Sequence, residues 1–393
     1  MAVDFISAEL KALQDAGLYR RLRRVEGDQD STLTLDGREV INFSSNNYLG
    51  IANHPALAAA AKAAIDRYGC GSGASRLISG NMTLHEELEA TLAKFKNTEA
   101  ALVFNSGFQA NIGILSTLAG EGDVILSDAL NHASIIDGCR LSKAQTLVYA
   151  HCDLKGLEAG LKQATPARRR LIVSETIFSM DGDEAPLAAI VELAEKYDAM
   201  VMVDEAHGTG VFGANGAGVV AKWGLASRVL IQMGTLGKAL GGFGAYVAGS
   251  RDLCDLLINR CRSFIFTTSL PPAVMAMALA AIDLVQSEPE RRAALQHNCQ
   301  KLKAGLSRLG FELGKSTSPI LPLMVGDAGR CMALSAALLE QGVFAQGIRP
   351  PTVPVGTSRL RITLMATHSE AQIERALNIF EEVKRRWPAI TTS

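Results

Sequence analysis

The sequence predicts an α/β protein, with a mostly parallel central sheet covered by helices on both faces and a smaller α+β domain at the C-terminus. From about residue 100, short apolar runs alternate with segments of helical periodicity. Near-continuous apolar strands joined by helices are typical of parallel sheets buried on both faces. The chain has 393 residues, more than one ordinary domain contains. The predicted strands cover residues 100–104, 123–126, 146–149, 170–174, 200–204, 229–232 and 245–248.

Three regions are expected along the chain. Residues 1–50 form an N-terminal segment with a helix and a hairpin, and residues 51–286 form the large domain. A change of composition at Ser287–Arg291 opens the small domain, residues 287–393. Within the large domain, helical periodicity is clearest at residues 54–67, 84–95 and 187–197.

The N-terminal segment carries two local signals. An amphipathic helix is predicted over residues 1–30, with the basic cluster 20–24 at its end, where cations favour the helix dipole. The pair Asp36-Gly37 lies between two short apolar runs and is typical of a tight hairpin turn.

The composition indicates an ordinary globular protein. The net charge of −1 argues against binding to nucleic acid or to a membrane surface, because both favour a basic excess. The seven cysteines are odd in number and none is spaced as Cys-x-x-Cys, so we expect reduced thiols in a cytoplasmic protein and no metal site. The N-terminus lacks an apolar signal region, and the longest apolar stretch, residues 273–282, is too short to cross a membrane.

A lysine and an aspartate carry the clearest chemical signal. Lys238 follows the predicted strand 229–232 and has glycines on both sides. Asp204 ends the strand 200–204. A lysine that forms a Schiff base and an aspartate on a pyridinium nitrogen are protein groups that pyridoxal 5′-phosphate (PLP) chemistry requires. We therefore predict a PLP site in which Lys238 is the covalent anchor and Asp204 keeps the ring nitrogen protonated.

Each of these residues also has a simpler interpretation. Asp204 alone would be assigned as a helix N-cap, and Lys238 alone as a surface lysine. A non-catalytic protein on the same fold, or an aminotransferase that converts alanine to pyruvate, would also fit part of the pattern. The two residues together, with His207 three positions after Asp204, favour the catalytic PLP site.

Other side chains that follow strands are expected to contact the cofactor ring, because ligands of open α/β sheets bind beyond the carboxyl ends of strands. His207 is expected to hydrogen-bond the 3-hydroxyl group of PLP. His132, in the turn after strand 123–126, is expected to stack on the ring and to take part in catalysis. Ser179 and Glu175 follow strand 170–174 and are expected to line the same site, although Glu175 also fits an ordinary polar loop.

The phosphate group of PLP has its own candidates. Ser106, Gly107 and Phe108 lie between a strand and a helix, and free N–H groups at a helix N-terminus bind phosphate. Thr235 offers a hydroxyl group to the same phosphate.

Four motifs of this sequence belong together: residues 42–50 (NFSSNNYLG), 71–76 (GSGASR), 204–210 (DEAHGTG) and 235–238 (TLGK). In combination they resemble the α-oxoamine synthase family, PLP enzymes of the aspartate-aminotransferase fold type I. The resemblance extends over roughly residues 36–368. It implies condensation of an amino acid with an acyl thioester, with loss of carbon dioxide.

The resemblance also implies a homodimer with its active sites at the interface. Thr267 and Thr268 would then reach the phosphate of the cofactor bound to the neighbouring subunit. It further implies four residues that contact the substrates: Arg361 at the amino-acid carboxylate, Asn47 near that amino acid, Arg21 at the acyl substrate, and Thr352.

The substrates are suggested by residues 348–361 (IRPPTVPVGTSRLR) and 77–81 (LISGN). Both resemble the biotin-pathway branch of the family, which joins L-alanine to pimeloyl-CoA or to a pimeloyl carrier protein. The branch that joins glycine to acetyl-CoA remains the alternative, since the motifs shared by the family do not separate the two.

Overall fold

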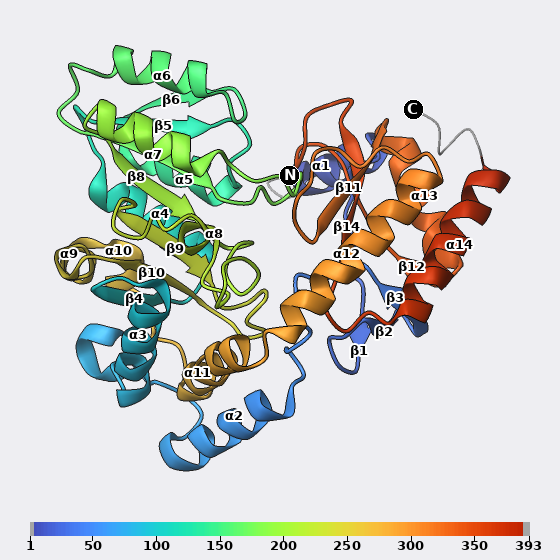
Figure 1. Ribbon diagram of the computed structural model, residues 1–393, viewed down its shortest axis with the longest axis horizontal. Helices are drawn as coiled ribbons and strands as arrows, with labels where there is room; N and C mark the ends of the chain where they lie inside the picture. Colours follow the sequence, from blue (N-terminus) through green and yellow to red (C-terminus); the bar gives the residue numbers. More distant parts are fainter. Residues whose placement is uncertain (1–3, 388–393) are drawn as a thin grey trace. The chain divides into compact units, whose positions relative to one another are not determined.

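The computed structural model describes residues 4–387 and divides into two compact units (Figure 1). One unit comprises Asn46–Leu295. The other combines the chain up to Ser45 with the chain from Gln296 onward. The N-terminal segment therefore groups with the C-terminal residues, which the sequence did not predict.

A seven-stranded sheet is the centre of the first unit, and its strand order is β4-β10-β9-β8-β7-β5-β6. Each of the seven predicted strands is present. Their burial explains why they could be predicted, since β4, β5, β8 and β10 consist almost entirely of buried residues. The strands are β4 (Ala100–Phe104), β5 (Val124–Asp128), β6 (Gln145–Tyr149), β7 (Arg170–Glu175), β8 (Met200–Asp204), β9 (Ile231–Thr235) and β10 (Ala245–Gly249).

The direction of the strands brings the loops that follow them to one edge of this sheet. Strands β5 to β9 are paired in parallel, and β10 is antiparallel to both β9 and β4. β4 consequently runs in the same direction as β9. The carboxyl ends of β4, β5, β7, β8 and β9 therefore lie at the same edge.

Helices cover this sheet in two groups, which confirms the predicted α/β class. α4 packs against β9 and β10 and contacts α5, α9 and α10, whereas α6 packs against β5 and β6 and contacts α7. Buried side chains such as Leu115, Ile125 and Met233 form the core between α4 and the sheet. The helical segments are α2 (Pro55–Tyr68), the π-helix η1 (Arg76–Gly80), α3 (Thr83–Lys96), α4 (Gly107–Leu118), α5 (Ala133–Ser142), α6 (Leu154–Gln163), α7 (Leu187–Lys196), α8 (Val219–Lys222), α9 (Arg251–Arg260), α10 (Arg262–Ile265) and α11 (Pro272–Ser287).

The second unit has two small sheets, ordered β1-β2-β3-β12 and β11-β14-β13. β3 pairs in parallel with β12, with Ile41 opposite Val343. This long-range pairing attaches the N-terminal segment to the C-terminal residues. The elements are α1 (Asp4–Asp15), β1 (Val25–Glu26), β2 (Thr32–Leu35), β3 (Arg38–Asn42), α12 (Glu290–Arg308), which begins in the first unit, β11 (Ile320–Gly326), α13 (Ala328–Glu340), β12 (Val343–Phe344), β13 (Gln346–Ile348), β14 (Ser358–Thr363) and α14 (Glu370–Arg386).

One of the two N-terminal predictions is correct and the other is wrong. The hairpin at Asp36-Gly37 is confirmed, since β2 and β3 pair on either side of it and both turn residues have positive φ. The predicted helix over residues 1–30 is too long, and its first three residues lie outside the described part of the chain. α1 ends at Asp15 because Gly17 adopts a left-handed conformation, with φ of 66°, that stops the helix. The basic cluster 20–24 therefore lies outside any helix.

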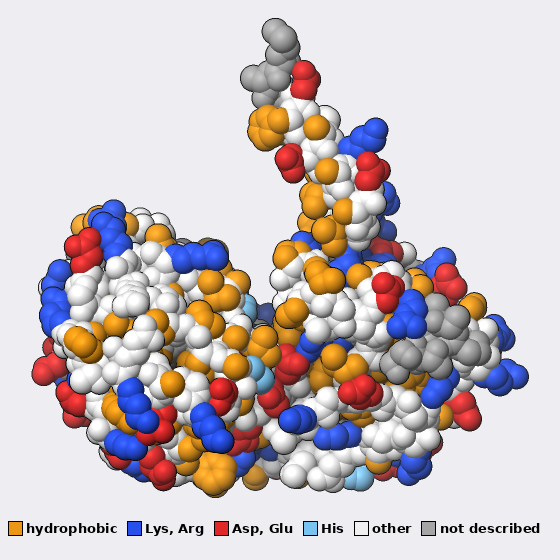
Figure 2. All heavy atoms as spheres, turned by 90° about the horizontal axis from the view of Figure 1, so that it is seen from above, with side chains coloured by type: hydrophobic (Ala, Val, Ile, Leu, Met, Phe, Trp, Pro, Cys, Tyr) orange, Lys and Arg blue, Asp and Glu red, His pale blue; other side chains and the backbone are white. Residues whose placement is uncertain are grey.

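α1 leaves its apolar side chains in solvent. None of its described residues is buried, and Phe5 remains 65% exposed. Ile6, Leu10 and Leu13 are exposed as well, and Figure 2 shows hydrophobic side chains along this projecting helix. An amphipathic helix normally covers its apolar face with protein. Nothing within the described chain covers this one.

The apolar stretch 273–282 lies in α11, which packs against α2 and α3. Among the described residues, no helix has both the length and the apolar character needed to cross a membrane.

A buried ion pair joins α3 to the loop after β8. Lys96 Nζ donates to the carboxylate of Glu205 and to the Ala217 carbonyl, and both charged side chains are fully buried. Glu205 also accepts the backbone N–H groups of Val219 at 2.6 Å and Val220 at 3.0 Å. Burial lowers the pKa of Lys96, but Glu205 and Tyr246 together outweigh it and leave the pKa above its usual value, so the lysine remains charged.

Replacing Lys96 with methionine is expected to lower the free energy of unfolding by about 3–5 kcal/mol, because it leaves a buried carboxylate without its cation. Urea titration of the purified variant measures this loss. Lys94→Met is the matched control, since Lys94 is exposed on the same helix. A loss for Lys96→Met no larger than that of the control would contradict the assigned role.

Candidate active site

The sheet edge defined above collects the residues that were predicted to bind a cofactor. Ser106 follows β4, His132 follows β5, Ser179 follows β7, His207 follows β8 and Lys238 follows β9. All belong to the unit Asn46–Leu295.

Lys238 lies beside a histidine whose orientation is fixed by a tyrosine. Its Nζ is 2.8 Å from His207 Nε2, and the Tyr48 hydroxyl is 2.7 Å from His207 Nδ1. A charged Nζ donates to Nε2, which leaves Nδ1–H to donate to Tyr48. Lys238 is half-buried, whereas His207 and Tyr48 are buried. The three side chains form one hydrogen-bonded chain at the end of β8 and β9.

Asp204 is a buried carboxylate with neutral partners. Its Oδ1 accepts the N–H of Ala206 and its Oδ2 accepts Nδ2–H of Asn111, both at 2.8 Å. The N-cap interpretation is thus partly correct, since Oδ1 caps the turn that follows β8. Both donors are amides, so they leave the negative charge without a countercharge. A protonated pyridinium N–H supplies the missing cation, and the carboxylate therefore fits the ring nitrogen of PLP.

His132 connects to Asp204 through two polar side chains. Ser134 Oγ lies 2.8 Å from His132 Nδ1 and accepts Nδ2–H of Asn111 at 2.9 Å. Asn111 in turn donates to Asp204. His132 is the N-cap of α5, and its side chain is exposed to solvent. Its ring is thereby oriented while it stays accessible to a ligand.

The proposed phosphate residues lie at the start of α4. Ser106 is its N-cap, and its Oγ accepts the N–H of Gln109 at 3.2 Å. The N–H groups of Gly107 and Phe108 belong to the first turn, which has no intrahelical acceptors. Thr235 differs from the prediction in one respect, since its hydroxyl donates to the Gly244 carbonyl at 3.0 Å. To donate to a phosphate, this hydroxyl would have to exchange that partner.

Thr267 and Thr268 follow α10 and are tied to the end of β4. Asn105 Nδ2 donates to the Thr268 carbonyl at 2.7 Å and to Thr267 Oγ1 at 3.4 Å. Their predicted contact is with the cofactor of a second subunit.

The four predicted substrate residues are divided between the two units. Asn47 belongs to the first unit, and its Oδ1 accepts the N–H groups of Ile51 at 3.0 Å and Ala52 at 3.2 Å. Arg361 is buried in β14 of the second unit. Arg21 and Thr352 are exposed in loops of that unit.

Sequence reasoning gave no role to Tyr48, Asn111 or Ser134, which complete the two hydrogen-bonded chains. Tyr48 lies within the motif 42–50, and Ser134 lies two residues after His132. Asn111 had no local signal except its polarity within an apolar helix. A buried amide in such a position needs partners, and that requirement is the signal that would have identified it.

Glu175, predicted either to line the site or to lie in a polar loop, is a buried residue at the end of β7. It is 2% exposed, and its Oε2 accepts the N–H of Ser179 at 3.1 Å. Burial raises its pKa well above the usual range, and the neighbouring Asp204 carboxylate raises it further. Burial therefore favours the neutral, protonated form of this side chain.

Glu175→Gln is expected to change the free energy of unfolding by less than about 1 kcal/mol, because glutamine keeps the neutral acceptor for Ser179. Glu175→Ala removes that acceptor and should cost about 1–3 kcal/mol. Urea titrations of the two variants compare them directly. Equal losses in both would contradict a neutral Glu175.

Comparisons with known proteins identify the family to which this chain belongs. The model of the family "Aminotransferase class I and II" matches residues 38–380. An 8-amino-7-oxononanoate synthase of Geotalea daltonii is 54% identical over 96% of this chain and 97% of its own length. A serine palmitoyltransferase from S. paucimobilis, solved with bound PLP, has a TM-score of 0.92 at 36% identity, with 98% of each chain covered. An 8-amino-7-oxononanoate synthase from Francisella tularensis has a TM-score of 0.76 at 31% identity, covering 88% of this chain and 99% of that one.

The chain therefore belongs to the aminotransferase class I and II family. Its predicted place among the α-oxoamine synthases and its predicted fold type are both confirmed.

Proposed function

We propose that this protein is a PLP-dependent acyltransferase that condenses L-alanine with a pimeloyl thioester to give 8-amino-7-oxononanoate, carbon dioxide and a free thiol. This is a reaction of biotin biosynthesis. The single observation that carries the proposal is the grouping of Lys238, His207 and Asp204 at one sheet edge. The full-length relatives named 8-amino-7-oxononanoate synthase support the choice of reaction over other condensations.

PLP, when bound, supplies an electron sink for charge that develops at the α-carbon of the amino acid. Asp204, whose two present donors are neutral amides, would balance the charge of the protonated ring nitrogen. His207 Nε2, which contacts Lys238 in this structure, would hydrogen-bond the 3-hydroxyl. Ser106, Gly107 and Phe108 would hold the phosphate at the start of α4.

Lys238 has two tasks. Its amine anchors the cofactor, and after alanine displaces it the same amine removes the α-proton of alanine. In this structure Nζ lies beside His207 Nε2 at the sheet edge, and the lysine would give up this contact when Nε2 binds the 3-hydroxyl. His132, oriented by Ser134, would stack on the cofactor ring and polarise the thioester carbonyl.

Four residues are assigned to substrate binding. We assign the alanine carboxylate to Arg361, whose planar guanidinium is suited to bidentate contact with a carboxylate. Asn47 lies near the amino acid, and Arg21 and Thr352 contact the acyl substrate. The expected donor is pimeloyl-CoA or a pimeloyl carrier protein.

The functional form is proposed to be a cytoplasmic homodimer with active sites at its interface. The exposed apolar side chains of α1 support it. Thr267 and Thr268 are held in place by hydrogen bonds from Asn105. In a dimer, these threonines contact the phosphate bound by the partner.

The test of the proposed function is thiol release from pimeloyl-CoA by the PLP-loaded protein, with L-alanine, glycine or no amino acid. Release that requires L-alanine is expected. Release only with glycine and acetyl-CoA would overturn the assigned substrates. Pyruvate formation from alanine without thiol release would indicate an aminotransferase instead.

A further inference from the structure

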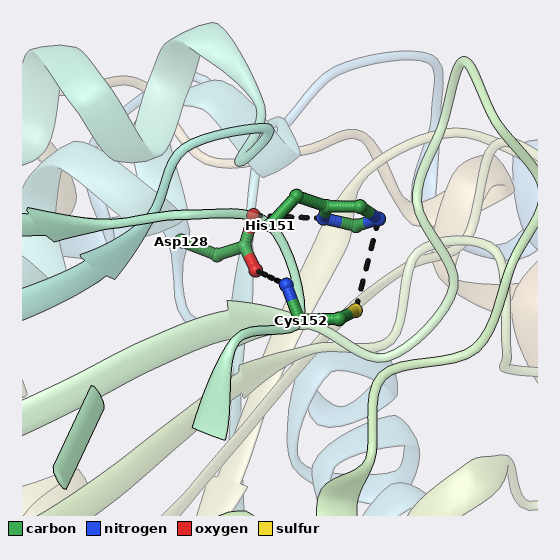
Figure 3. Close-up of side chains that lie close together, drawn as sticks. All are labelled: Asp128, His151 and Cys152. Atoms are coloured by element: carbon green, nitrogen blue, oxygen red, sulfur yellow. Dashed lines mark hydrogen bonds and ion pairs between the residues drawn. The ribbon is translucent and has the colours of Figure 1, made fainter. Parts of the chain in front are cut away.

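A second polar cluster lies at the same sheet edge, outside the residues assigned above. It consists of Asp128 at the end of β5 and His151 and Cys152 in the turn between β6 and α6 (Figure 3). Their ligand atoms lie within 4.8 Å of one another, a spacing that would suit a metal ion.

The hydrogen bonds of this cluster favour a different function. Asp128 Oδ1 lies 3.0 Å from His151 Nδ1, and Asp128 Oδ2 accepts the N–H of Cys152 at 2.8 Å. On the other side of the ring, His151 Nε2 lies 2.8 Å from Asp183 Oδ2. Both ring nitrogens thus face carboxylates, and both donate only when the ring is protonated. A metal ion would have to displace these bonds, so the arrangement fits an imidazolium between two carboxylates.

The electrostatics agree with this geometry. Burial lowers the pKa of His151, but the hydrogen bonds to Asp128 and Asp183 outweigh it and raise the pKa to about 12. The ring therefore carries a positive charge throughout the range in which enzymes work. Charge-assisted hydrogen bonds of this kind are about twice as strong as neutral ones.

On one side, the imidazolium is bonded to the segment that leads to His132. Asp128 Oδ1, which accepts from His151, also accepts the N–H of Leu130 at 2.9 Å. The backbone carbonyl of Asp128 accepts the N–H of Asn131. His132 directly follows Asn131, so the hydrogen bond between His151 and Asp128 is linked to the turn that carries His132.

On the other side, the imidazolium is bonded to the loop that carries Ser179. The Asp183 carbonyl accepts the N–H of Phe178 at 3.0 Å, and the Phe178 carbonyl accepts the N–H of Gly182 at 2.8 Å. The Phe178 ring packs edge-on against His151, with centroids 4.3 Å apart. Ser179 directly follows Phe178, so the loop around it is attached to His151 by both a polar and an aromatic contact.

We propose that His151 is a positioning residue whose cationic ring joins the His132 turn to the Ser179 loop and so fixes the separation of these two segments of the proposed cofactor site. The proposal rests on the proposed function, which assigns His132 to the cofactor, and on the sequence prediction that Ser179 lines the same site. His151 itself touches neither substrate nor cofactor. Without its charge, Asp128 and Asp183 would repel each other across the ring position.

The first test is the dissociation constant of PLP, measured by absorbance titration of the dimeric apoprotein. His151→Gln is expected to raise it about tenfold, equivalent to about 1.4 kcal/mol. Asp183→Asn is a second variant in case His151→Gln folds poorly. It keeps the shape of the side chain that contacts His151 but removes its charge. His297→Gln is the matched control, since that histidine is exposed and paired with Glu370. An unchanged PLP affinity in both His151→Gln and Asp183→Asn would overturn the proposal.

The second test is a double-mutant cycle between His151→Gln and Ser179→Ala. If His151 acts through the Ser179 loop, the double variant should bind PLP about as weakly as the weaker single variant. If the losses of PLP affinity in the two single variants add up in the double variant, His151 and Ser179 act independently. That result would also overturn the proposal. If the wild-type protein binds no PLP, the proposed function fails too. If the wild-type protein binds PLP normally and His151→Gln leaves that affinity unchanged, only the role of His151 is overturned.

Discussion

Lys238→Ala is expected to abolish turnover and to remove the visible absorbance of covalently bound cofactor. The same amine anchors PLP and moves the α-proton of alanine, so the rate should fall by at least about 10⁴-fold. The loss should be chemical and not structural, because Lys238 is half-buried and its contact is with the His207 ring. Thiol release and the absorbance spectrum of the purified variant measure both effects.

Lys162→Ala is the control for this experiment, since Lys162 is exposed on α6. It should keep the wild-type spectrum and rate. Near-normal turnover in Lys238→Ala would be incompatible with its role as anchor and base.

Asp204→Asn is expected to retain cofactor but to slow exchange of the alanine α-proton with solvent by about 10²–10⁴-fold. The structure explains why this variant should fold. Asn111 now donates to Asp204, and its own Oδ1 accepts no hydrogen bond in the described part of the chain. A flip of the Asn111 amide would let it accept from the new asparagine, at the loss of its hydrogen bond to Ser134 Oγ. The variant thus loses the charge that balances the ring nitrogen while it keeps its packing.

Proton exchange is followed by NMR of L-alanine in deuterated buffer. Asp198→Asn, at a fully exposed position, should exchange as fast as the wild type. Exchange at the wild-type rate in Asp204→Asn would contradict the function given to that carboxylate.

The central sheet and most of the site were predictable because their signals are local. Buried strands such as β4 and β8 are apolar runs with polar neighbours, and parallel topology brings their ends together. Asp204 ends β8, His207 lies three residues after it, and Lys238 lies three residues after the end of β9.

Features that depend on contacts distant in sequence were missed. Asn111 reaches Asp204 across 93 residues, and no local pattern marks it. The pairing of β3 with β12 is also a long-range contact, so the grouping of the N-terminal segment with the C-terminal residues was not foreseen. The first helix was predicted too long for a local reason. The helical periodicity continues past residue 15, but the left-handed conformation of Gly17 ends the helix there.

The most direct test of the central claim is to reduce the PLP-loaded protein with borohydride and to map the modified peptide by mass spectrometry. Borohydride fixes the cofactor to the lysine that holds it. The account predicts a single phosphopyridoxyl group on Lys238. A label on another lysine, or no label in protein that has taken up PLP, would contradict it.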